Sequence, residues 1–344
     1  MILRNGRDEK MTLKEAYDYG VEQLQKSEIM DAKQDSFTLL EHVTRMNRGK
    51  YYAMNQKEMG QEEQREYIAL IRKRCMRIPL QHLMGTTEFM GLPFKINPHV
   101  LIPRQDTELL VETALGWIKE SLRSDREKHE FKGESSQKRS KVVNQIGVEK
   151  EEVAEEKAGK EECRILDMCT GSGCILISIL HYVTKDFPKI KGVGVDISPE
   201  ALEIAKENAQ KNGLNVARSM ESQMVFIESD LFAQLNPEEK YHMIVSNPPY
   251  IPTKEIEGLE EEVRSYDPIL ALDGREDGLY FYRRIIEQSP DYLTEEGVLM
   301  VECGWNQGEE VSQLMRESGF GQVKVIKDYH GLDRVVVANK AMNS

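Results

Sequence analysis

The sequence predicts an α/β fold, a mostly parallel sheet of seven strands covered by helices on both faces and preceded by a small domain made only of helices. Two patterns support this prediction. From Arg164 onward, short apolar runs alternate with helix-like runs, as in a parallel sheet joined by crossover helices. Residues 10–84 show helical periodicity alone. The chain of 344 residues is long enough for both parts.

The helical part covers residues 1–84. Thr12 followed by Glu15 predicts a capping box at the start of its first helix. A later helical pattern runs from about 61 to 77, and Pro79 prevents it from continuing. No cluster of chemistry-bearing side chains occurs in this part, so we expect it to recognise a partner or to pack on its neighbour rather than to perform chemistry.

A linker between the two domains is expected over residues 85–103. Aromatic residues on either side of Gly91 and Pro93 predict a β-hairpin with these two residues at its turn. A helix is expected from Asp106 onward, with Asp106 or Thr107 as its cap.

The sheet domain is expected over residues 104–344, with a charged insertion at about 119–162. This insertion cannot bury enough apolar surface to offset its chain entropy, so we predict that it is flexible. The expected strands are 164–168, 192–196, 224–228, 242–246, 297–302, 323–327 and 334–338. The last two leave no room for a helix between them, so one of them should be antiparallel to the rest. The helices between strands are expected to begin at Ser172, at Ser198, near Gly278 and near Asn306.

Composition excludes several classes of protein. No apolar stretch is long enough to span a membrane, and the first residues lack the apolar core of a signal peptide, which favours the cytoplasm. The five cysteines show no C-x-x-C spacing, so we expect reduced thiols and no metal site. A net charge of −13 argues against a broad electrostatic grip on nucleic acid. We therefore expect no direct binding of nucleic acid. We also expect a monomer, although composition gives no indication of the oligomeric state.

The most informative motif is Asn247-Pro248-Pro249-Tyr250, which follows a predicted buried strand. An amide or exocyclic amine nitrogen is a poor nucleophile, so a catalyst must hold its N–H groups with acceptors and aim its lone pair at the electrophile. Asn247 and the Pro248 carbonyl can accept, the prolines fix the backbone, and Tyr250 offers a flat face. An ordinary loop after a strand is the competing interpretation. The position directly after a buried strand, where ligand sites of open α/β sheets collect, favours a site over a loop, and the residue types indicate methyl transfer to a planar nitrogen.

A Gly-rich turn follows the first strand of the sheet and opens an apolar helix. It comprises Cys169, Thr170, Gly171, Ser172 and Gly173. Asp196 ends the next strand, where a carboxylate can accept from both hydroxyls of a ribose, although it can also cap the following helix. Asp230 is expected to meet an adenine amine, with Leu231 or Phe232 over the ring.

The same geometry serves dinucleotides, and a tight turn without any ligand remains an alternative. The turn lacks the G-x-G-x-x-G pattern, however, and the fourth strand delivers Asn247 rather than a hydride-transfer site. These two facts favour S-adenosylmethionine, with S-adenosylhomocysteine as product and with Asn247 also lying beside the donor.

With these motifs the chain resembles the HemK/PrmC family, the N5-glutamine methyltransferases of peptide chain release factors. The resemblance covers most of the chain apart from the charged insertion. It rests on PLQHLMG at 79–85, EFMGLPFK at 88–95, LIPR at 101–104, ALDG at 271–274, ECG at 302–304 and DRVV at 333–336. It implies a Rossmann-like, class I S-adenosylmethionine-dependent methyltransferase domain, with the helical domain as its substrate-docking part.

The resemblance also implies roles for individual residues. Asn247 and Pro248 would bind the glutamine amide of the release factor's Gly-Gly-Gln loop, with Tyr250 as packing wall. The chain departs from the family's text where Cys169 replaces a frequent glycine and where Gln105-Asp106 replaces a common Pro-Glu. An adenine-N6 or cytosine-N4 methyltransferase of nucleic acid shares the tetrapeptide and is the alternative enzyme, and a non-catalytic interaction protein is the alternative of another class.

Overall fold

The computed structural model describes residues 10–121, 162–216 and 223–341. The chain forms two compact units: unit 1 is Met1–Pro103 with Pro249–Gly278, and unit 2 is Arg104–Pro248 with Leu279–Ser344. Sequence periodicity did not indicate that the segment after Pro248 belongs with the first unit. Apart from its two ends, the charged insertion expected at about 119–162 lies outside the described residues.

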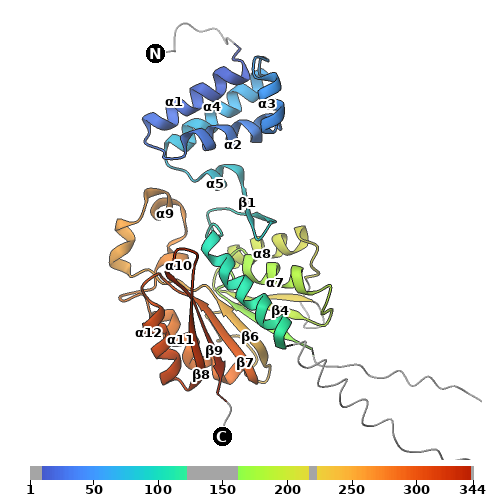
Figure 1. Ribbon diagram of the computed structural model, residues 1–344, viewed down its shortest axis with the longest axis vertical. Coiled ribbons are helices and arrows are strands. Elements are labelled where there is room, and N and C mark those ends of the chain that lie inside the picture. Colours follow the sequence, from blue (N-terminus) through green and yellow to red (C-terminus); the bar gives the residue numbers. More distant parts are fainter. Residues whose placement is uncertain (1–9, 122–161, 217–222, 342–344) are drawn as a thin grey trace, which may run out of the picture. The chain divides into compact units, whose positions relative to one another are not determined.

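Unit 1 begins with a bundle of helices around its own apolar core (Figure 1). Its helices are α1 (Leu13–Lys26), α2 (Ala32–Thr44), α3 (Arg48–Met54), α4 (Gln61–Cys75) and α5 (Leu80–Met84). The capping box is confirmed, because the Thr12 hydroxyl accepts from the Glu15 N–H at 3.2 Å and Glu15 accepts from the Thr12 N–H at 2.8 Å. The short helices α3 and α5 were not predicted individually.

Close packing in the bundle depends on Gly20 in α1. The Tyr67 hydroxyl and the Ser36 hydroxyl lie 2.8 Å apart in the core, and both residues are fully buried. A Cβ atom at position 20 would lie 2.0 Å from the Tyr67 oxygen, so only glycine lets α1 approach this hydroxyl pair.

The linker hairpin forms with Gly91 in its turn, as predicted, but the predicted place of Pro93 at the turn is wrong. Strands β1 (Thr86–Phe89) and β2 (Leu92–Lys95) pair antiparallel, and Pro93 lies inside β2, opposite Glu88. The turn is Met90-Gly91, and both residues have positive φ, 52° and 70°. A two-residue turn of this kind matches the twist of the flanking strands, which is why the turn falls there.

The segment after the Asn-Pro-Pro-Tyr motif completes unit 1. It contains η2 (Thr253–Gly258), α9 (Glu261–Tyr266) and α10 (Ile269–Leu272). Glu262 binds Arg74 of α4 at 2.9 Å, and the Tyr266 hydroxyl donates to the Met76 carbonyl at 2.8 Å. These contacts join two segments that lie far apart in the sequence.

The described strands of unit 2 form the predicted α/β sheet. They are β3 (Arg164–Met168), β4 (Lys191–Asp196), β5 (Met224–Glu228), β6 (Tyr241–Ser246), β7 (Leu293–Glu302), β8 (Phe320–Lys327) and β9 (Asp333–Lys340). Their order is β5-β4-β3-β6-β7-β9-β8. The first five strands in this order, β5, β4, β3, β6 and β7, pair in parallel. Strand β9 is antiparallel to both β7 and β8, as the short connection between the last two strands predicted.

Helices cover both halves of this sheet (Figure 1). Helices α7 (Cys174–Val183) and α8 (Pro199–Lys211) contact β3 to β5, whereas α11 (Tyr280–Tyr292) and α12 (Gly308–Glu317) contact β7 to β9. The start of α8 is as predicted, with the Ser198 hydroxyl accepting from the Ala201 N–H at 3.1 Å. The start of α7 is two residues later than predicted, because Gly173 has φ of 78° and cannot belong to the helix.

The expected cap at Asp106 or Thr107 is also corrected. Both residues lie inside the 3-10 turn η1 (Gln105–Thr107), directly before helical residues 108–121. The Thr107 side chain is buried and has another partner, which belongs to the site described below.

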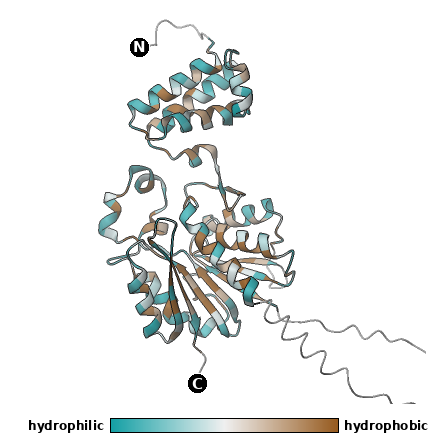
Figure 2. Ribbon diagram, in the orientation of Figure 1, coloured by the Kyte–Doolittle hydropathy of each residue, from teal (hydrophilic) through white to brown (hydrophobic). Residues whose placement is uncertain are grey.

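The core of unit 2 lies on the central strands, which are the brown ribbons in Figure 2. Residues Met243, Ile244 and Val245 of β6 are fully buried, which agrees with a strand covered on both faces. Among the described helices, none has the length and apolar character that crossing a membrane requires.

Candidate active site

The ends of three parallel strands place the predicted site residues at one edge of the sheet. Met168, the last residue of β3, pairs with Val195 of β4 on one side and with Ser246 of β6 on the other. The Gly-rich turn, Asp196 and Asn247 therefore follow directly from three adjacent strand ends. In open α/β sheets, ligands bind in the crevice at this edge.

The Gly-rich turn has three residues in the left-handed region: Cys169 at φ 61°, Gly171 at 54° and Gly173 at 78°. Cys169 adopts this conformation despite its Cβ, at a cost of about 1–2 kcal/mol. A Cβ on Gly173 would lie 2.8 Å from Ile177, whereas a Cβ on Gly171 would meet nothing within 4 Å. The positive φ at both positions favours glycine, and Gly171 in addition faces open space.

Asp196 is tied to this turn. Its carboxylate accepts from the Gly171 N–H at 2.8 Å and from the Ser198 N–H at 3.0 Å. Burial raises the pKa of Asp196, and the hydrogen bonds from these N–H groups act in the opposite direction. Ser198 itself caps α8, so Asp196 is not the capping residue. Its role toward a ribose stays a prediction.

Asp230 and Leu231 follow β5. The Asp230 carboxylate is exposed and forms two hydrogen bonds with Arg284 of α11, at 2.8 and 3.1 Å. Phe232 is buried and stacks on Tyr292 with ring centroids 4.6 Å apart, so it is a core residue. Contact of Asp230 with an adenine amine stays a prediction, and Arg284 was not anticipated.

The Asn-Pro-Pro-Tyr motif continues directly from β6, and the boundary between the two units falls after Pro248. In unit 2, the Asn247 Nδ2 donates to the Thr107 hydroxyl at 3.2 Å. Asn247 and Tyr250 are half-buried, whereas Pro248 and Pro249 are buried. The motif is thus fixed on its strand side and keeps one partly exposed amide.

In unit 1, the chain after the motif is clamped by residues 272–275. The Ile251 N–H donates to the Leu272 carbonyl at 3.0 Å, and the Gly274 N–H donates to the Ile251 carbonyl at 2.9 Å. A Cβ on Gly274 would lie 2.8 Å from the Tyr250 Cα. This close approach is a structural reason for the glycine that ends ALDG at 271–274.

Sequence reasoning missed two buried carboxyl groups at the strand ends. Asp167 in β3 accepts from the Thr170 hydroxyl at 2.5 Å, and burial raises its pKa to about 7. Glu302 ends β7 with 1% of its surface exposed, and burial raises its pKa to about 7, against hydrogen bonds from Thr107 and Asn247 that lower it. An acidic residue within an apolar strand was the available signal, because such a group is rarely buried without a purpose.

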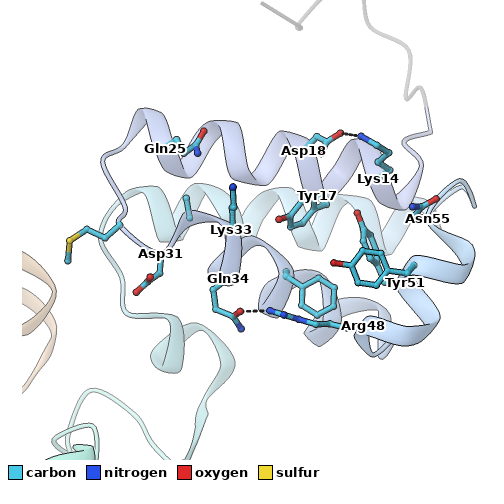
Figure 3. A pocket seen from close by; sticks show the side chains of 14 residues that line it. Lys14, Tyr17, Asp18, Gln25, Asp31, Lys33, Gln34, Arg48, Tyr51 and Asn55 are labelled. Atoms are coloured by element: carbon cyan, nitrogen blue, oxygen red, sulfur yellow. Dashed lines mark hydrogen bonds and ion pairs between the residues drawn. The ribbon is translucent and has the colours of Figure 1, made fainter.

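A separate cavity of about 650 Å³ lies on the helical bundle of unit 1, between α1, α2 and α3 (Figure 3). Tyr17, Tyr51 and Arg48 contribute to its wall, and the Lys14–Asp18 ion pair lies at its edge. The described residues hold no cluster of His, Cys, Asp or Glu that suits a metal ion. The cavity offers aromatic and charged surface but no group suited to methyl transfer.

Comparison with known proteins supports a family assignment. Residues 15–85 match the model of the PrmC N-terminal domain, and residues 159–334 match a methyltransferase domain model. A release factor glutamine methyltransferase of Geobacter sulfurreducens is 33% identical over 96% of this chain and 97% of its own length. One from Fusobacterium nucleatum is 34% identical over 95% of this chain and 79% of its own.

Among solved structures, the release factor-specific protein-(glutamine-N5) methyltransferase of Alicyclobacillus acidocaldarius is 27% identical, covering 72% of this chain and 99% of its own, with a TM-score of 0.35. The sequence relatives decide the family, because their identity exceeds 30% over nearly the whole chain. The protein belongs to the release factor glutamine methyltransferase family.

Proposed function

We propose that this protein transfers a methyl group from S-adenosylmethionine to the side-chain amide nitrogen, N5, of the glutamine in the Gly-Gly-Gln motif of peptide chain release factors. The observation that carries the proposal is the position of Asn247 at the end of β6, one strand away from the Gly-rich turn after β3. The names of the sequence relatives support the same activity.

The residues at the sheet edge fit S-adenosylmethionine. Gly171 faces open space, which allows close approach of a ligand to the backbone, and Asp196 presents a carboxylate at the end of β4. The Asp196 carboxylate accepts from backbone N–H groups, among them those of Gly171 and Ser198, and keeps lone pairs for a ribose hydroxyl. The Cys169–Gly173 turn, Asp230 and Leu231 would complete the binding site. When bound, the cofactor supplies an electrophilic methyl group on a sulfonium.

The chain's own contribution is to hold and orient the substrate amide. Asn247 Oδ1 and the Pro248 carbonyl accept hydrogen bonds from the two N–H groups of the substrate amide. These hydrogen bonds fix the plane of the substrate amide and the direction of its lone pair. Transfer would form the N–C bond as the S–C bond of the sulfonium breaks, leaving S-adenosylhomocysteine, and the substrate nitrogen would then release one proton to water. No nucleophile or strong base is needed, because positioning lowers the barrier. Pro249 fixes the backbone, and Tyr250 forms a wall of the site.

The two parts of the chain have separate roles in this proposal. The helical domain, residues 1–84, docks the release factor, and residues 85–103 link it to the methyltransferase domain at 104–344. The relatives' names support a release factor as the protein partner. We infer that the enzyme works as a monomer in the cytoplasm and contacts no nucleic acid directly, which fits its net charge of −13.

The decisive experiment measures transfer of labelled methyl from S-adenosylmethionine to a purified release factor. The control substrate is the same factor with its Gly-Gly-Gln glutamine changed to alanine, and duplex and single-stranded DNA are the rival substrates. Label on the intact factor alone supports the proposal. Label on DNA would favour an adenine-N6 or cytosine-N4 methyltransferase, and label on neither would favour a binding protein.

A further inference from the structure

Asn247 makes a set of contacts that fixes which end of its amide faces outward. Its Nδ2 donates to the Thr107 hydroxyl at 3.2 Å, and its side chain also donates to the Glu302 carboxyl group. The nitrogen end of the amide therefore faces Thr107 and Glu302. Among the described residues no partner is recorded for Asn247 Oδ1.

Glu302 is held rigidly behind this contact. It is 1% exposed at the end of β7, and its backbone carbonyl accepts from the buried Tyr282 hydroxyl of α11 at 2.8 Å. Thr107, 2% exposed, also donates a hydrogen bond to the Glu302 carboxyl group. Three side chains from β7, η1 and the end of β6 thus form a closed set of hydrogen bonds.

The reversed orientation of the amide is unfavourable. It would bring Asn247 Oδ1 against the Glu302 carboxyl oxygens, placing acceptor against acceptor in a buried position, and would turn the NH2 group outward. An outward NH2 group cannot accept a hydrogen bond from a substrate amide. The direction of the Asn247 side chain therefore decides whether the site can hold an N–H group at all.

We propose that Glu302 and Thr107 are positioning residues that lock the Asn247 amide with Oδ1 toward the substrate, and so give the site its preference for an N–H-bearing substrate. This inference rests on the proposed function. Neither residue touches the substrate; both act through Asn247.

The state of Glu302 depends on the groups around it. Arg334 of β9 favours its charged form, Asp106 of η1 opposes it, and burial opposes it most. Burial raises the pKa of the Cys174 thiol of α7, and the Glu302 charge raises it further. An ionised Glu302 can only accept, which enforces the lock, whereas a protonated one can donate and loosens it.

Thr107→Val, Thr107→Ser and Glu302→Gln test the inference, with Thr113→Val as matched control. Thr113 lies in the helical residues 108–121 and donates to the Leu109 carbonyl at 2.7 Å, and among the described residues no hydrogen bond joins it to Asn247. For Thr107→Val we expect kcat to fall about tenfold or more, with KM for the release factor within about threefold, because the lost interaction orients the reacting group. Thr107→Ser should restore most of kcat, and Thr113→Val should change little.

Rates are normalised to the stoichiometry and Kd of S-adenosylmethionine binding, so that misfolded protein is not counted. Glu302→Gln should flatten the pH dependence of kcat between about pH 6 and 8. If Thr107→Val behaves like Thr113→Val, the inference is wrong, and the Thr107 series decides the matter alone should Glu302→Gln fail to fold. Wild-type activity on the release factor is measured in parallel, so a failure of the proposed function is seen separately as loss of wild-type methylation.

Discussion

Both units bury a carboxyl group, but they give it different partners. In unit 1, Asp35 of α2 binds Arg74 of α4 at 2.7 Å, and the two side chains are only 8% and 7% exposed. In unit 2, Glu302 binds the neutral side chains of Thr107 and Asn247, and one of its oxygens, Oε2, is buried without a hydrogen-bond partner among the described residues.

The difference separates a structural carboxyl group from one that serves the site. Arg74 also binds Glu262 at 2.9 Å, so it joins α2, α4 and α9 within unit 1. An ion pair of this kind orders the elements around it. Glu302 lacks a direct ion pair among the contacts recorded for the described residues, and its hydrogen bonds act on the orientation of Asn247. The first group should govern stability, and the second should govern catalysis and its pH dependence.

The largest effect on stability is expected from Arg74→Met. This change leaves Asp35 buried without its cation, which costs about 3–5 kcal/mol of unfolding free energy. Both tryptophans, Trp117 and Trp305, belong to unit 2, so circular dichroism at the helix band should show early unfolding while tryptophan fluorescence stays unchanged.

The matched control for that change is Arg316→Met, whose exposed pair with Glu309 should contribute less than about 1 kcal/mol. A loss below about 1 kcal/mol in Arg74→Met as well would mean that the buried pair does not hold unit 1 together.

The largest effect on catalysis is expected from Asn247→Ala. Removing an acceptor that orients the reacting amide should lower kcat by about 10²–10³-fold, by analogy with loss of one preorganised hydrogen-bond partner in other enzymes. Affinity for S-adenosylmethionine, measured by calorimetry, should stay within about threefold, and the melting temperature should be nearly unchanged. Full methylation by this variant would remove the basis of the proposed function.

Asp196→Asn should act on cofactor binding. Asparagine keeps the shape of the side chain but replaces one carboxylate oxygen by an NH2 group and removes the negative charge. The hydrogen bonds accepted from the Gly171 N–H and from a ribose are weakened, so the affinity for S-adenosylmethionine should fall about tenfold or more. Calorimetry with S-adenosylmethionine and with its product measures this, and addition of NAD should produce no signal. Unchanged affinity would assign Asp196 to the turn alone.

Much of the fold follows from local patterns in the sequence. The strands over 164–168 and 224–228 form at the predicted residues, and the antiparallel last pair follows from the short connection between β8 and β9. The return of Pro249–Gly278 to unit 1 was not predictable, because it depends on contacts such as Glu262 with Arg74. Sequence periodicity carries no information about pairs at that separation.

The candidate site was predictable only in part, for a related reason. Motif and strand position together placed Asn247 and Asp196 at the same sheet edge, and the register of β3 with β4 and β6 agrees with that placement. Thr107 lies 140 residues before Asn247 in the sequence, and Glu302 lies on the neighbouring strand β7. Glu302 belongs to the ECG text at 302–304, but that text does not indicate this contact, so only the tertiary structure reveals it.

The pH dependence of stability should distinguish Glu302 from other carboxyl groups. Its pKa of about 7 in the folded protein lies above the usual 4.5, so the folded state keeps a proton that the unfolded chain releases in this range. Glu302 therefore contributes stability that is full below pH 4.5 and is lost as the pH rises through 7. The melting temperature of Glu302→Gln, minus that of the wild type, should be higher at about pH 8 than at about pH 5. An equal difference at both values would show that Glu302 ionises normally.

The smallest effects are expected at the exposed pair of Asp230 and Arg284, where the Asp230 side chain is 51% exposed. Water screens such a pair, so removing either residue should change the unfolding free energy by less than about 1 kcal/mol. If Asp230 meets the adenine amine, Asp230→Ala should weaken S-adenosylmethionine binding by about three- to tenfold, because one hydrogen bond is lost. Arg284→Ala should leave binding within about threefold, since Asp230 keeps its acceptors. Calorimetry on the two variants measures both values, and an equal loss in both would mean that the ion pair itself, rather than Asp230 alone, shapes the cofactor site.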